Sequence, residues 1–253
     1  MTRVPAISKR SAVPVPVSIR GHRLRNEILI ELPAKECAAL FSKLEFVPLP
    51  VRTVLNEVDE SIKFAFFLNE GLASILSIAP DGKSVEVGLS GREGFVGLPL
   101  TAGLSTSPTR VLVQVAGSGF RIAAKDLRAA LVNCPKLAIA LLRFGQEMAL
   151  QSSQVAACNR LHEVDERLAR WLLMSQDRLG GDLVPLTQEF LAHMLGTRRA
   201  SVTVAAGILQ KAGLISYKRG TLNIEKRTQL EETACECYKT LIRQVKTWRA
   251  EAN

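Results

Sequence analysis

The stretch from Leu186 to Ile224 most constrains the fold, because it reads as two short helices followed by a tight hairpin. Thr187 is a suitable N-cap for the first helix, and Gly196 is placed to end it. Thr197 is a suitable N-cap for the second helix. The pattern predicts two packed helices joined by a glycine turn, with a β-hairpin after them.

The second of these helices has an apolar and a polar face. Val202, Ile208 and Leu209 are expected to face the core. Arg199 is expected outside, where a guanidinium offers two parallel donors that match O6 and N7 of guanine. Such a helix fits the major groove of DNA, since its N-terminal turn meets base edges and its dipole favours phosphate.

Lys218 and Arg219 are expected at the tip of the hairpin, where they would contact phosphate. A solvated turn is the alternative for such a charge pair, but its position after two packed helices favours the contact with DNA. The residues expected at double-stranded DNA are Thr187, Thr197, Arg198, Arg199, Ser201, Thr203, Lys218 and Arg219.

The net charge agrees with an anionic partner. The formal charge is +9 and the pI is about 9.6, while 47% of residues are hydrophobic and 23% are charged, as in a soluble globular protein. Residues 1–25 are basic, contain no acidic residue and are interpreted as a flexible arm, either a solvated tail or an aid to DNA binding. No segment approaches the ~18 apolar residues of a membrane span, so we expect a cytoplasmic protein.

The region from 26 to 135 is expected to form an antiparallel β-roll. A helical segment over 26–46, closed by Pro48 and Pro50, precedes it, and a short helix over 126–132 follows. Glycine-containing turns separate the expected strands. These strands are Ile62–Leu68, Leu72–Ile78, Ser84–Leu89, Arg110–Val115 and Gly119–Ile122.

A long helix is predicted over 136–163, because two apolar rows repeat there every seven residues. The rows are typical of a coiled-coil seam, and we favour a homodimer interface over the alternative of a helix packed on its own domain. The expected interface residues are Leu137, Leu141, Phe144, Met148, Gln151, Val155 and Cys158.

The remaining region, 164–253, is predicted to be a winged helix-turn-helix domain, opened by a helix over Asp165–Ser175. The chain as a whole is therefore expected to be α+β. Its predicted parts are a basic arm (1–25), a β-roll (26–135), a dimerisation helix (136–163) and the C-terminal domain (164–253).

At this point the chain resembles a known family. The segment GTRRASVTVAAGILQKAGLIS is similar to the recognition helix and wing of Crp/Fnr regulators, and VDERLARWLL resembles the helix that opens their DNA-binding domain. Three further segments resemble the β-roll of the cyclic-nucleotide-binding fold: FFLNEGLASILS, the DGK turn and GREGFVGLPL. The resemblance implies a transcriptional regulator that binds a near-palindromic operator as a homodimer and works with RNA polymerase.

Two departures limit what the resemblance implies about the operator. Many Crp/Fnr regulators have Glu after the first arginine of the recognition helix and a further Arg one turn later. Here Ala200 follows Arg199, and Val204 occupies the later position. The half-site common in the family is therefore not expected.

The resemblance also implies an effector pocket, whose expected residues are Gly97, Leu98, Thr109, Arg110, Ser152 and Ser153. Cyclic-nucleotide binders have Glu where Leu98 stands, and leucine cannot accept a hydrogen bond from the ribose. Cyclic nucleotide is therefore disfavoured, no cofactor is predicted, and the effector stays open. A sensing module that acts mainly through protein partners is the alternative function.

Five cysteines are present, and none form a CxxC pair. We interpret them as reduced structural thiols and expect no metal site, since Cys235 and Cys237 would point to different sides of one helix. Only Cys37 precedes the roll, which argues against an iron–sulfur sensor. No nucleophile with a base, paired carboxylates or phosphate loop has usable spacing, so the protein is not expected to be an enzyme.

Overall fold

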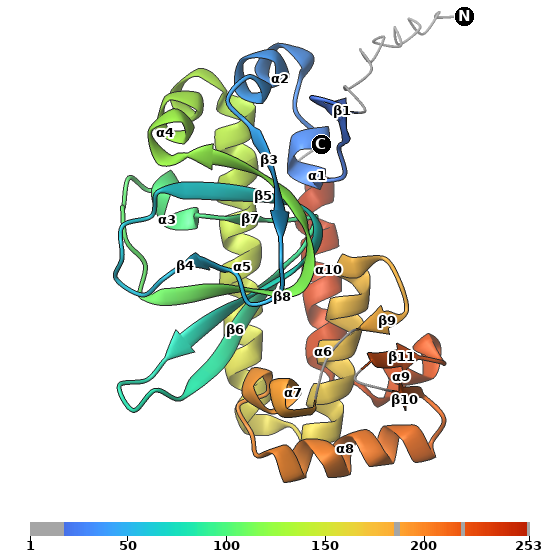
Figure 1. Cartoon of the computed structure of the whole chain (residues 1–253). Helices are drawn as coiled ribbons and strands as arrows, with labels where there is room; N and C mark the ends of the chain where they lie inside the picture. Colours follow the sequence, from blue (N-terminus) through green and yellow to red (C-terminus); the bar gives the residue numbers. More distant parts are fainter. Residues whose placement is uncertain (1–17, 185–187, 219–220, 252–253) are drawn as a thin grey trace, which may run out of the picture.

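The computed structural model describes residues 18–184, 188–218 and 221–251. A β-roll at the N-terminal end, a long central helix and a mostly helical C-terminal region lie side by side (Figure 1). The prediction of an α+β chain is confirmed. Among the described residues, no helix combines the length and apolar character that crossing a bilayer requires.

The roll is built around an antiparallel sheet with the strand order β3-β8-β5-β6. Its strands are β3 (Glu45–Leu49), β8 (Thr109–Ala123), β5 (Phe64–Ile78) and β6 (Ser84–Ser90). Two short strands complete it: β4 (Val54–Asn56) pairs with β8, and β7 (Phe95–Val96) pairs with β5. Short helix α3 (Leu98–Thr101) follows β7.

The prediction of turns inside β5 and β8 was wrong. Each strand runs on for 15 residues, and their pairing shifts register between Leu68 and Ala73. Gly71 has a φ of +87°, and a Cβ there would lie 2.5 Å from the main-chain oxygen of Val115. Gly117 faces Gly71 across the pair, where a side chain would also meet backbone. These glycines therefore bend two continuous strands and do not reverse the chain.

The prediction of a flexible arm over residues 1–25 is wrong for its last eight residues. Residues 18–25, expected in the arm, include a hairpin of β1 (Ser18–Ile19) and β2 (His22–Arg23). Ile19 within the hairpin and Leu24 directly after it are buried. The rest of the expected arm, 1–17, lies outside the described residues.

The expected helix over 26–46 is divided into α1 (Glu27–Ile30), α2 (Ala34–Phe41) and the start of β3. Pro33 begins α2 in an extended conformation, which interrupts the helix. Pro48, expected to close a helix, instead lies within β3. It is tolerated there because β3 is at the sheet edge.

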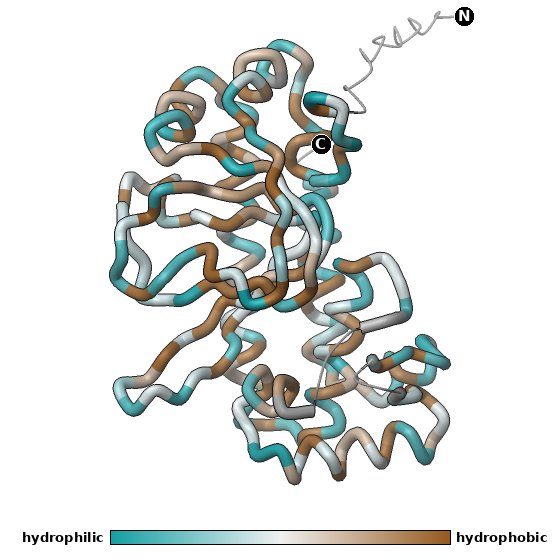
Figure 2. The backbone as a smooth tube through the Cα atoms, viewed as in Figure 1, coloured by the Kyte–Doolittle hydropathy of each residue, from teal (hydrophilic) through white to brown (hydrophobic). Residues whose placement is uncertain are grey.

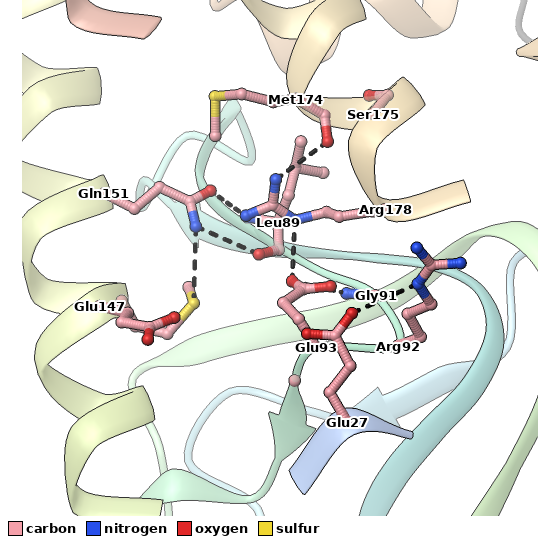
Figure 3. Close-up of polar contacts among 12 residues, drawn as sticks. Glu27, Leu89, Gly91, Arg92, Glu93, Glu147, Gln151, Met174, Ser175 and Arg178 are labelled. Atoms are coloured by element: carbon pink, nitrogen blue, oxygen red, sulfur yellow. Dashed lines mark hydrogen bonds and ion pairs between the residues drawn. The ribbon is translucent and has the colours of Figure 1, made fainter. Parts of the chain in front are cut away.

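Helix α4 (Ala124–Asn133) leads into the long helix α5 (Pro135–Leu161), which covers the edge strand β6. The Gln151 amide accepts a hydrogen bond from Leu89 N at 2.8 Å and donates to Leu89 O at 3.2 Å (Figure 3). Ser152 Oγ donates to Val87 O at 2.8 Å. The polar side chains of α5 therefore satisfy main-chain groups of a strand that has no partner on that side.

The seam expected to face a second copy is buried in the chain itself. All seven predicted interface residues lie on the face of α5 that packs against the same chain, which corrects the prediction. Apolar residues recur at the same spacing in a helix that covers its own sheet and in a helix that packs on a partner chain. The sequence pattern therefore could not distinguish these two arrangements. The buried residues are Leu137, Leu141, Phe144, Met148, Gln151, Val155 and Cys158.

The C-terminal region begins with α6 (Val164–Leu179), which has a capping box between Glu163 and Glu166 and ends at Gly180 with a φ of +70°. A three-stranded sheet in the order β10-β11-β9 accompanies the helices. Its hydrophobic core joins α6 to buried leucines of the roll. In Figure 2 hydrophobic segments alternate with more polar ones along the roll strands. The elements are β9 (Leu183–Val184), α7 (Gln188–Met194), α8 (Arg199–Lys211), β10 (Ile215–Lys218), β11 (Thr221–Ile224), α9 (Arg227–Thr233) and α10 (Glu236–Glu251).

Candidate nucleic-acid interface

Helices α7 and α8 form the predicted helix-turn-helix, with Gly196 between them at a φ of +58°. Leu191, Val202 and Leu209 are fully buried between these helices and α6. Ala206 is also buried, so the backbones approach closely without a bulky side chain between them. The buried face fixes which side of α8 remains available to a partner.

The outer face of α8 carries the predicted cationic residues. Arg198 and Arg199 are exposed at the N-terminal end, and α8 contains no acidic residue. Arg198, and not the predicted Thr197, occupies the N-cap position. Thr203 is exposed and its Oγ1 donates to Arg199 O at 3.0 Å, while Ser201 is half-buried.

One core prediction for α8 was wrong. Ile208 is 50% exposed, and Val204 on the same face is 64% exposed. Both belong to the exposed surface of the helix, away from the buried row of Val202 and Leu209. The available surface therefore combines a cationic end with an apolar middle.

The predicted hairpin is present as β10 and β11, paired antiparallel with Tyr217 opposite Leu222. β9 adds a third strand that the sequence reading did not include. Lys218 ends β10, but its side chain lies outside the described part of the chain, as do Arg219 and Thr187.

The helix-turn-helix is docked on the roll. Trp171 Nε1 in α6 donates to Glu86 Oε1 in β6 at 2.7 Å, and both side chains are buried. Burial raises the pKa of Glu86 to about 7. Arg178 in α6 forms a 2.9 Å ion pair with Glu93, which follows β6 (Figure 3). The β5–β6 hairpin also reaches the turn before α8, where a Cβ at Gly196 would lie 2.9 Å from Val85 Cγ2.

The expected effector pocket is nearly closed. Gly97, Leu98 and Thr109 line a cavity of about 80 Å³ that Met148 of α5 also borders. A small-molecule site usually has ~300 Å³ or more, so a nucleotide does not fit this cavity. Arg110 is not among its lining residues and instead pairs with Glu57 at 2.9 Å.

The two serines expected in the pocket are engaged elsewhere. Ser152 donates to β6, and Ser153 Oγ donates to Ala149 O at 2.9 Å within α5. A larger cavity, of about 550 Å³, lies between α1, α5 and α10, and sequence reasoning did not identify it. Arg249 borders it and forms ion pairs with Glu27 at 3.2 Å and Glu147 at 3.3 Å. This cavity exists because α10 returns to the roll, a long-range contact that no local pattern indicated.

A second group of chemically active side chains lies where α5 ends and α10 begins. The ligand atoms of Cys158, His162, Cys235 and Cys237 all lie within 4.8 Å of one another, so these residues could bind a metal. This corrects the expectation that Cys235 and Cys237 point apart: Cys235 precedes the first residue of α10 and is not on the helix. A hydrogen bond with Cys235, together with the charge of nearby Arg170, lowers the pKa of Cys158.

These features define a class of architecture, in which a β-roll, a long helix and a winged helix-turn-helix are combined in one chain. Residues 166–233 match the family model described as the Crp-like helix-turn-helix domain. This region is therefore a Crp-like helix-turn-helix domain, and the fold of the chain around it is that of solved Crp/Fnr regulators.

Solved structures agree on the fold. A Crp/Fnr-family regulator from Eubacterium rectale ATCC 33656 is 14% identical with a TM-score of 0.64, covering 82% of this chain and 97% of its own. FixK2 from Bradyrhizobium japonicum is 14% identical with a TM-score of 0.66, covering 76% and 98%. The c-di-GMP-responsive global regulator CLP from Xanthomonas campestris is 17% identical with a TM-score of 0.61, covering 76% and 98%. No curated protein sequence matches the chain significantly.

Proposed function

We propose that the protein binds a near-palindromic operator as a homodimer, with one α8 in each of two successive major grooves. The observation that carries this proposal is the exposure of Arg198 and Arg199 at the N-terminal end of a helix whose opposite face is buried. A helix held by its apolar face presents its first turn rigidly, as base reading requires. Since a protein in this role works beside the chromosome, we keep the expected cytoplasmic location and the expected contact with RNA polymerase as predictions.

Arg199 is the proposed base reader, through two donors to a guanine. Val204 and Ile208, further along α8, add exposed aliphatic groups to the surface of the helix. Such groups contact the C5-methyl group of thymine in the major groove. We therefore expect a half-site that combines a guanine near the start of α8 with thymines further along it. This pattern of base contacts differs from that of regulators with Glu at the position of Ala200 and Arg at the position of Val204.

The proposed dimer uses the outer face of α5, because the inner face is occupied by the roll. Ile139 and Leu142 are large and 42% and 62% exposed, respectively. Small residues at heptad spacing continue this face and allow a second helix to approach closely. The proposed row is Ala138, Leu142, Gly145, Ala149 and Ala156.

We further propose that regulation does not use cyclic nucleotide in the usual pocket. The cavity of about 80 Å³ beside Gly97 and Leu98 supports this, as does the ion pair that occupies Arg110. The alternative, a sensing module that acts mainly through protein partners, is disfavoured because nothing in the described part of the chain covers the cationic end of α8.

The proposal is tested by titrating the full-length protein onto non-specific duplex DNA at 50 and 200 mM salt, followed by genomic footprinting. We expect affinity to fall by orders of magnitude as salt rises, since phosphate binding releases counterions. Footprints should show near-palindromic sites with half-sites about one helical turn apart. Salt-independent binding, or the absence of any footprint, would reject the proposal.

A further inference from the structure

We propose that Cys158, His162, Cys235 and Cys237 form a structural zinc site that joins the end of α5 to the start of α10. This site is separate from the nucleic-acid interface and from the cavity beside Gly97. It takes a single divalent zinc ion through three thiolates and one imidazole.

The spacing of the four ligand atoms fits one tetrahedral ion. Cys158 Sγ lies 3.4 Å from Cys235 Sγ, and Cys237 Sγ lies 3.7 Å from His162 Nδ1. Zinc bonds of about 2.3 Å to sulfur and 2.0–2.1 Å to nitrogen place tetrahedral ligand atoms roughly 3.5–3.8 Å apart. Since all four atoms lie within 4.8 Å of one another, the wider separations need to close by about 1 Å for one ion to contact all of them.

The orientation of His162 supports the same conclusion. While Nδ1 faces Cys237, Nε2 lies 3.1 Å from Glu236 Oε1. Histidines that bind zinc commonly donate the opposite ring N–H to a carboxylate, which fixes the tautomer and the ring orientation. Glu236 is thus placed to hold the imidazole so that Nδ1 presents its lone pair to the ion.

Two buried arginines lie close to the cluster, and their positive charge would be stabilised by negative charge on the ligands. Arg167 and Arg170 are 7% and 3% exposed, and the Nε atom of each has no hydrogen-bond partner. Among the described residues, neither guanidinium forms an ion pair at 4.0 Å or less, and the buried Glu86 is the acidic group whose charge reaches Arg170. Three thiolates and one Zn²⁺ carry a net charge of −1, which offsets part of this buried positive charge.

The ligand set favours zinc over other ions and over a disulfide. Buried thiolates with one imidazole in a tetrahedral arrangement are typical of structural zinc sites. A disulfide between Cys158 and Cys235 would require their sulfurs to move from 3.4 Å to about 2.05 Å apart, and it would leave Cys237 and His162 without a role. The cysteines at 158, 235 and 237 are all buried, as expected for a closed site.

The position of the site gives it a mechanical role. Cys158 and Cys235 are 77 residues apart, and the segment between them contains the whole helix-turn-helix and its wing. An ion bound by both therefore closes this segment onto the end of α5. Zinc would hold α9 and α10 against α6 and limit how far the C-terminal region moves relative to the roll.

The test uses the full-length protein, purified under reducing conditions without chelator and equilibrated with Zn²⁺. Elemental analysis after removal of free metal should give about one zinc per chain. Replacement by Co²⁺ should give the intense d–d bands of a tetrahedral ion and a thiolate-to-cobalt charge-transfer band. Cys237→Ser should weaken zinc binding at least tenfold in competition with a chromophoric chelator. Cys134→Ser, which removes a buried thiol outside the cluster, should leave it unchanged.

The proposal is overturned if the unsubstituted protein holds less than a tenth of an equivalent of zinc, if its cobalt spectrum lacks the thiolate band, or if anaerobically prepared protein contains a Cys158–Cys235 disulfide. The cobalt spectrum is recorded on the unsubstituted chain, so the test does not depend on whether Cys237→Ser folds. None of these readouts involves DNA, so they succeed or fail independently of operator binding.

Discussion

Trp171 Nε1 donates a 2.7 Å hydrogen bond to Glu86 Oε1, and this bond connects the helix that opens the DNA-binding region to the edge strand of the roll. The second carboxylate oxygen of Glu86 is buried without a hydrogen-bond partner. Leu72, Leu76 and Leu89 of the roll share a core with Leu168 of α6 around this pair. The bond therefore fixes the orientation of two elements that apolar contacts alone would hold less specifically.

This relationship predicts a pH dependence of stability. The pKa of Glu86 is raised from 4.5 to about 7 by burial, so between these values the folded protein binds more protons at Glu86 than the unfolded chain. The contribution of Glu86 to the free energy of unfolding should fall as pH rises from 4.5 to 7, by roughly 3 kcal/mol. Glu86→Gln should remove this loss while keeping an acceptor for Trp171.

Urea unfolding at pH 5 and pH 8 measures the effect. Other titrating groups contribute equally to both proteins, so the difference between their two pH responses isolates Glu86. Equal losses of stability in the original protein and in Glu86→Gln would show that this carboxyl does not titrate as described.

Arg199→Ala should weaken operator binding by about 1–3 kcal/mol, because a bidentate contact to guanine is lost. Binding to non-specific duplex should change much less. Arg128→Ala, which removes an exposed arginine from α4 in the roll, is the matched control. Quantitative footprinting on the operator gives both affinities, and an operator affinity unaffected by Arg199→Ala would remove this residue from base reading.

Leu142→Asp should give monomers in sedimentation velocity, because it places a charge on the proposed dimer face of α5. Val132→Asp is the control, since Val132 is 83% exposed on α4 and lies outside that face. A dimer that survives Leu142→Asp would place the interface elsewhere.

Met148→Asp should act differently, although Met148 belongs to the same helix. Its side chain is buried, and its terminal methyl group lies 2.5 Å from the position a Cβ would take at Gly88. An unpaired carboxylate there should cost more than about 3 kcal/mol of stability. Thermal unfolding of Met148→Asp should therefore show a large decrease in Tm; a folded monomer of unchanged Tm would contradict the packing of α5 on the roll.

Cyclic AMP at 1 mM should produce no heat of binding and no shift in Tm, because the cavity beside Gly97 and Leu98 is too small for a nucleotide. The control is a short duplex containing the operator, which should raise the Tm of the same sample. Saturable binding of cyclic AMP in the micromolar range would mean that Met148 and its neighbours move to open the site.

Local patterns in the sequence predicted the helix-turn-helix well. Gly196 ends one helix, and Val202 and Leu209 mark the inner face of the next, so short-range spacing was enough to place α8. Ile208 was predicted to face the core together with Val202 and Leu209, but the period of the helix turns it outward.

Longer-range features were not accessible in the same way. Gly71 and Gly117 have the chemistry of turns, and only the pairing of β5 with β8 shows that they face each other within continuous strands. The position of Cys158 beside Cys235 depends on how a 77-residue segment folds back, so neither residue's neighbours in sequence indicated the cluster.

The contact between Val85 and Gly196 has a consequence for how such a chain can evolve. Gly196 combines a left-handed backbone with a neighbour that leaves no space for a side chain, so any replacement there requires a smaller residue at 85 as well as a strained backbone. Since the same turn sets the direction of α8, a change in the β5–β6 hairpin of the roll at Val85 also affects the orientation of α8. Divergence in operator preference is therefore easier through side chains along α8 than through a change in its angle.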